Sequence, residues 1–180
     1  MEKDQRMPEK IHEWVAPLAG EASARLGDRE PDWELNGVYC GKGNPYIRAC
    51  ETAKSFSIHL TEVVIDDKRE LIYQLSHEIV HCLNPEAGFT NYLEEGMAVM
   101  FAKTMLSGYG YDHADLPNNE NYKKAYELVC QLPTDPYITI KKYRGNSCRS
   151  IRSIERKELK AMFPEICDEL CDMLLAEFEV

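Results

Sequence analysis

Residues 71–83 read LIYQLSHEIVHCL and combine an apolar stripe with a small group of ionisable side chains. The apolar positions of the stripe are Leu71, Ile72, Leu75, Ile79 and Leu83. Their spacing of three and four residues is that of one helix face, and it predicts an α-helix over about residues 68–83. Asn84-Pro85 ends this helix, because the residue before a proline disfavours helical backbone angles.

The ionisable group on this helix consists of His77, Glu78 and His81. The two histidines are four residues apart, so they lie on one face of the helix about one turn apart. One tetrahedral zinc ion could bind a nitrogen from each. Glu78 could reach a water on the metal and act as general base, which is the chemistry of an HExxH motif. The simpler alternative is a surface helix with two partly exposed histidines.

A third metal ligand is expected on the next helix, predicted over about residues 91–106. Glu94 and Glu95 compete for this role. Asn91 is a suitable N-cap, and Glu94 then lies at the third helical position, where it completes a capping box. Glu95 points about 100° away from Glu94. We assign Glu95 as the third ligand, with Glu94 as the alternative or as a hydrogen-bond acceptor that orients a ligating histidine.

The two predicted helices together resemble the gluzincin branch of zinc metallopeptidases. The resemblance rests on His77-Glu78-x-x-His81 followed by Glu95-Gly96-x-Ala98, and it covers about residues 55–105. It implies that His77, His81 and Glu95 bind zinc and that Glu78 is the base and proton shuttle. It also implies that a strand over residues 55–65 is the edge strand along which an extended peptide binds. Independently of the resemblance, the small Gly96 and Ala98 would allow the second helix to approach the first closely.

Peptide hydrolysis also requires a donor that stabilises the tetrahedral oxyanion. Tyr109, Tyr111 and His113 are candidates because they follow the second helix in a loop that could fold over the metal. His59, on the polar face of the strand at 55–65, is a further candidate.

The rest of the chain contains strand patterns in its first half and helix patterns in its second half. We predict a helix over residues 9–26, a strand over 33–39, a helix over 121–132, a helix or strand over 137–143, and one or two helices between 155 and 178 interrupted near Pro164. The pattern predicts an α+β fold. We expect residues 1–180 to form one zincin-like domain, with its metal core at about 55–105 and a helical C-terminal part at about 119–178.

Composition excludes several other classes of function. The chain has 180 residues, 31 acidic and 21 basic, and a net charge of −10, which argues against a nucleic-acid partner. The basic stretch at 141–156, which includes Arg144 and Arg152, is interpreted as a solvated surface. We find no signal-peptide pattern and no apolar run long enough for a membrane helix. Seven cysteines without a CxxC pair favour a reducing, cytoplasmic setting over a disulfide scaffold.

The sequence therefore predicts a zinc-dependent metallopeptidase with Zn²⁺ as cofactor and a peptide or protein as substrate. The alternative is a catalytically silent zinc-binding or protein-interaction module on the same scaffold. Nothing in the sequence indicates an oligomeric state.

Overall fold

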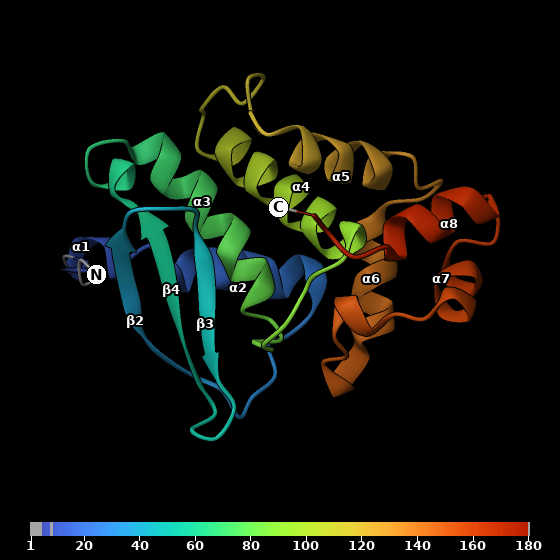
Figure 1. The fold of residues 1–180 in the computed structure, drawn as a ribbon, viewed down its shortest axis with the longest axis horizontal. Helices are drawn as coiled ribbons and strands as arrows, with labels where there is room; N and C mark the ends of the chain where they lie inside the picture. Colours follow the sequence, from blue (N-terminus) through green and yellow to red (C-terminus); the bar gives the residue numbers. More distant parts are fainter. Residues whose placement is uncertain (1–4, 8, 180) are drawn as a thin grey trace.

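The protein is a mixed α+β structure, described for residues 5–7 and 9–179 by a computed structural model. Its sheet contains the strands β1 (Gln5–Arg6), β2 (Glu34–Gly41), β3 (Tyr46–Cys50) and β4 (Ser55–Thr61) in the order β1-β2-β4-β3. β2 and β4 are parallel, whereas β1 and β3 are antiparallel to their neighbours. Figure 1 shows helices behind the sheet and further helices extending away from it.

The prediction that residues 55–65 form the edge strand is wrong. β4 ends at Thr61 and lies between β2 and β3, so both of its hydrogen-bonding sides are paired. Among the described strands, the one at the edge on this side of the sheet is β3, which the sequence pattern did not predict. Residues Glu62–Ile65 form a short 3₁₀ helix, and the side chains of Val63 and Ile65 are exposed.

The helix that carries the HExxH motif is α3 (Lys68–His81), which confirms the predicted helix with an end two residues earlier. The Asp67 carboxylate starts it by accepting hydrogen bonds from the backbone N–H groups of Arg69 and Glu70. The next helix is α4 (Tyr92–Gly108). The side chain of Asn91 accepts a hydrogen bond from the Glu94 N–H, as expected for the predicted N-cap.

The other helices agree with the predicted segments with two refinements. They are α1 (Glu9–His12), α2 (Val15–Leu26), α5 (Glu120–Cys130), α6 (Pro136–Arg144), α7 (Arg156–Met162) and α8 (Asp168–Leu175). The segment 9–26 is broken at residues 13–14. The ambiguous segment 137–143 is helical, with Asp135 capping it and Pro136 in its first turn.

α4 lies between α3 and α5 at the centre of the helical part (Figure 1). We expected Gly96 to allow α4 to approach α3, but it faces α5. A Cβ atom at Gly96 would lie 2.3 Å from the carbonyl oxygen of Ala125 and 2.5 Å from a methyl carbon of Val129. The missing side chain therefore sets the distance between α4 and α5.

The basic stretch at 141–156 is not uniformly a solvated surface. Arg144 is fully buried and donates hydrogen bonds to the carbonyl oxygens of Asp28 and Arg149. The side chain of Arg152 is only 11% exposed and lies beside the candidate site. Both guanidinium groups donate hydrogen bonds to buried oxygen atoms. The local density of charged residues in the sequence does not reveal such contacts, because most of the acceptors lie in distant segments. In the described residues, no helix combines the length and apolar character needed to cross a membrane.

Candidate metal centre

Three side chains from α3 and α4 converge in the interior of the protein. The Nε2 atoms of His77 and His81 are 3.2 Å apart. The carboxylate of Glu95 lies 3.1 Å from His77 Nε2 through one oxygen and 3.5 Å from His81 Nε2 through the other. All three residues are buried, and together they could hold a metal ion.

The spacing of these atoms fits a small divalent cation. Ligand atoms at the tetrahedral zinc distance of about 2.0–2.1 Å are separated from each other by roughly 3.3 Å. In addition, Glu95 Oε2 is buried and makes no hydrogen bond of good geometry, despite its short distance to His77. A buried, unsatisfied carboxylate oxygen is costly. A cation bound among the three side chains would satisfy it.

The electrostatics of the cluster point the same way. Burial lowers the pKa of His81, but the carboxylates of Glu95 and Glu94 outweigh burial and raise this pKa well above its ordinary value. Conversely, burial raises the pKa of Glu95, and the two histidines pull it well below its ordinary value. The carboxylates of Glu94 and Glu95 thus stabilise a positive charge on or beside the two histidines. A divalent cation would supply that charge and release the proton from His81.

Hydrogen bonds from surrounding residues orient two of the three candidate ligands, His81 and Glu95. Glu94 Oε1 lies 2.7 Å from His81 Nδ1, which leaves Nε2 of that ring facing the cluster. Arg152 donates two hydrogen bonds to the Glu94 carboxylate, at 2.9 and 2.8 Å. The Thr90 hydroxyl donates to Glu95 at 2.6 Å. The structure therefore brings Glu95 into the cluster and places Glu94 behind His81.

Arg152→Leu is expected to lower the free energy of unfolding of the metal-free protein by about 2 kcal/mol, because it removes charge-assisted hydrogen bonds from a buried carboxylate. Although burial favours the neutral form, the hydrogen bonds from His81 and Arg152 keep the pKa of Glu94 below its ordinary value. Urea unfolding measures the change. Arg149→Leu is the matched control, since Arg149 is solvated and should have a much smaller effect. Equal effects would show that Arg152 does not hold Glu94.

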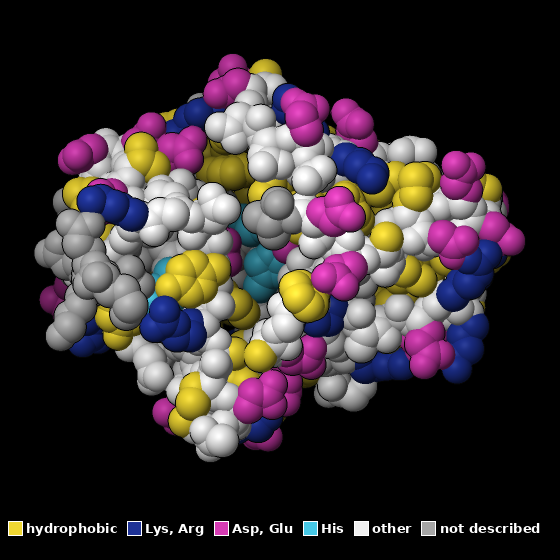
Figure 2. All heavy atoms as spheres, viewed as in Figure 1, with side chains coloured by type: hydrophobic (Ala, Val, Ile, Leu, Met, Phe, Trp, Pro, Cys, Tyr) yellow, Lys and Arg dark blue, Asp and Glu magenta, His cyan; other side chains and the backbone are white. Residues whose placement is uncertain are grey.

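The cluster lies at the bottom of a cleft of about 760 Å³. Figure 2 shows histidine atoms at the floor of a hollow near the centre of the molecular face. Residues 46–49 of the edge strand β3 form one wall, and the loop 86–90 contributes to the lining as well. Glu78 also lines the cleft and is 3% exposed. Burial raises the pKa of Glu78, against the opposing effect of His77 and His81.

The four residues expected to stabilise an oxyanion do not line this cleft. Tyr109 packs edge-on against Trp14, and His113 Nε2 lies 2.7 Å from the Ser107 hydroxyl. His59 is stacked with Tyr46, at a ring distance of 4.4 Å, and Tyr111 packs against the hydrophobic core.

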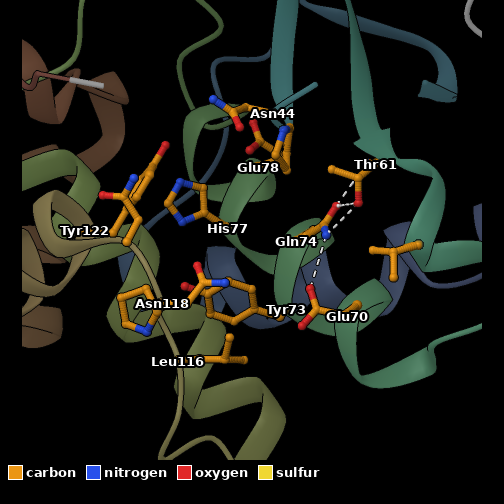
Figure 3. A pocket seen from close by; sticks show the side chains of 14 residues that line it. Asn44, Thr61, Glu70, Tyr73, Gln74, His77, Glu78, Leu116, Asn118 and Tyr122 are labelled. Atoms are coloured by element: carbon orange, nitrogen blue, oxygen red, sulfur yellow. Dashed lines mark hydrogen bonds between the residues drawn. The ribbon is translucent and has the colours of Figure 1, made fainter. Parts of the chain in front are cut away.

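Tyr122 of α5 occupies the position beside the cluster instead. Its ring centre is 5.5 Å from that of His77, and it lines the cleft together with Glu78. Figure 3 shows Tyr122 next to His77. No local pattern in the sequence marks Tyr122, because only the packing of α5 against α4 brings it to the cluster.

Comparison of the chain with protein-family models, with curated proteins and with solved structures finds no match. The function of the protein must therefore be inferred from the chemistry of its own residues.

Proposed function

We propose that the protein is a zinc-dependent metallopeptidase of gluzincin type that hydrolyses peptide bonds. The observation that carries the proposal is the buried cluster of His77, His81 and Glu95, whose ligand atoms have tetrahedral spacing, with Glu78 beside it in an open cleft. Three protein ligands leave one coordination position for water or substrate, which is typical of catalytic rather than structural zinc. Two imidazole nitrogens and one carboxylate also form a donor set that zinc accepts readily.

Several residues in and beside the cleft have a role in this proposal. When bound, zinc would polarise the scissile carbonyl and lower the pKa of the attacking water. Glu78 takes the proton from that water and delivers it to the leaving amine. Glu94 and Arg152 keep His81 oriented. The hydroxyl of Tyr122 is the candidate donor to the oxyanion, because this side chain contacts His77 from outside the ligand set.

The sheet supports a peptide as the substrate. Among the described strands, β3 lies at the edge of the sheet, and four of its residues line the cleft that contains Glu78. An extended chain could add to this edge through backbone hydrogen bonds, which bind peptides without regard to their sequence. The role first assigned to residues 55–65 thus passes to β3.

The native protein is expected to contain about one zinc ion per chain, and His77→Ala is expected to lose it. The reason is that His81 and Glu95 alone provide only two protein ligands, one fewer than catalytic zinc sites normally have. Mass spectrometry of metals after dialysis measures the content. His113→Ala is the matched control, because His113 lies outside the cleft and should leave the zinc content unchanged. Absence of zinc from the native protein and from both variants, after loading with zinc, would exclude the proposed centre.

A further inference from the structure

A second cavity opens beside the metal cluster and has no role in the chemistry described above. Its volume is about 370 Å³, and it shares His77, Glu78 and Tyr122 with the main cleft. It extends from the cluster towards the N-terminal end of α3, where Tyr73, Gln74 and Glu70 line it. In Figure 3, Tyr122 and His77 lie on one side of this cavity, and Thr61, Gln74 and Glu70 lie on the other.

The far end of the cavity carries a negative charge that is only partly compensated. Of the fourteen described residues that line it, none is Lys or Arg, whereas Glu70 and Glu78 are acidic. Glu70 Oε2 accepts a hydrogen bond from Gln74 at 3.2 Å, and Gln74 is held in turn by Thr61. The other oxygen of Glu70 makes a long ion pair with Arg69 Nη1, at 3.8 Å.

Arg69 compensates the charge of Glu70 only in part, because its Nε and Nη2 atoms have closer partners. Its Nε donates to the carbonyl oxygen of Asp112 at 2.8 Å, and Nη2 is paired with the carboxylate of Asp115. Glu70 therefore offers one carboxylate oxygen to the cavity, on a side chain that Gln74 keeps in place. Its side chain is 22% exposed, so an incoming cation would be only partly hydrated.

The walls between the metal cluster and Glu70 suit a long apolar stem. Tyr73, Tyr122 and Leu116 line this part of the cavity. Glu70 precedes His77 by seven residues on one helix, which corresponds to about 10 Å along the axis. A long side chain with an apolar stem and a positively charged end would therefore reach Glu70 while its stem packs on these three residues. Lysine and arginine have this design.

We propose that this cavity is the specificity pocket of the peptidase and that Glu70 selects substrates with a Lys or Arg side chain next to the cleaved bond. This inference rests on the proposed peptidase function, and it goes beyond that function by naming the class of peptide that is cleaved. The net charge of −10 favours the same class of substrate, since it attracts basic peptides to the molecule.

The test compares peptides that differ only in a Lys, norleucine or Glu residue at each position flanking the cleaved bond. For the native protein, kcat/KM is expected to be highest with Lys. Glu70→Gln should lower the ratio of kcat/KM for the Lys peptide to kcat/KM for the norleucine peptide by about tenfold, because it removes one partly buried ion pair. Glu70→Arg should shift the preference to Glu. Glu62→Gln is the matched control, because it removes an equal charge nearby from an exposed residue outside the cavity.

A binding measurement separates this inference from the proposed function. Peptidyl hydroxamates with a Lys or a norleucine side chain, built in both chain directions, bind a zinc centre without being hydrolysed. Calorimetry should show tighter binding of a Lys compound by the native protein and no preference by Glu70→Gln. Hydrolysis without any Lys preference, or equal binding of all hydroxamates, would overturn the inference and leave the peptidase intact. A Lys preference in binding without hydrolysis of any peptide would support the pocket and refute the peptidase.

Discussion

Glu78→Gln is expected to lower kcat/KM for peptide hydrolysis by about 10²–10⁴-fold, the usual contribution of a general base. The amide has nearly the shape of the carboxyl group but cannot accept a proton from the attacking water. Glu78 is not among the three candidate ligands, so the zinc content of this variant should equal that of the native protein. Measuring both quantities on the same preparation distinguishes loss of the base from loss of the metal.

Glu127→Gln is the control for this experiment, because Glu127 is an exposed residue of α5 that lines neither cavity near the three candidate ligands. Its activity should match that of the native protein. Undiminished hydrolysis by Glu78→Gln would remove Glu78 from the proposed role. A native protein that binds zinc and cleaves no member of a broad peptide library would instead be a silent zinc-binding module.

Gly96→Ala is expected to lower the free energy of unfolding by about 3 kcal/mol or more, near the upper end of the range for overpacked cores. The added methyl group would lie 2.3 Å from the carbonyl oxygen of Ala125 and 2.9 Å from its carbonyl carbon. Backbone atoms of a helix cannot rotate away as a side chain can. α4 and α5 must therefore move apart, which would shift Glu95 on one helix and Tyr122 on the other.

Gly108→Ala is the matched control at the end of the same helix, where an added Cβ meets nothing within 4 Å. Alanine is the better helix former, so this variant should be slightly more stable than the native protein, by up to about 1 kcal/mol. Urea unfolding of the two variants should thus give changes of opposite sign. A Gly96→Ala protein as stable as Gly108→Ala would show that α4 and α5 are not in close contact at this position.

Much of the helical structure was readable from local patterns, because the signals for a helix lie within a few residues of each other. The apolar stripe places α3, and Asn91 places the start of α4. The same locality explains the candidate ligands. His77 and His81 share a helix face by their spacing, and the cap at Asn91 assigns Glu94 and Glu95 to different faces.

The features that depend on contacts between distant segments could not be read in this way. Among the described strands, the pairing order places β3, and not β4, at an edge of the sheet. Tyr122 reaches the cluster because α5 packs on α4, and Arg152 reaches Glu94 across 58 residues of sequence. The sequence alone therefore specified the chemical groups of the candidate metal centre and the helices that carry them. Packing between elements specified their surroundings, since burial, pairing and charge compensation are properties of contacts that no local pattern encodes.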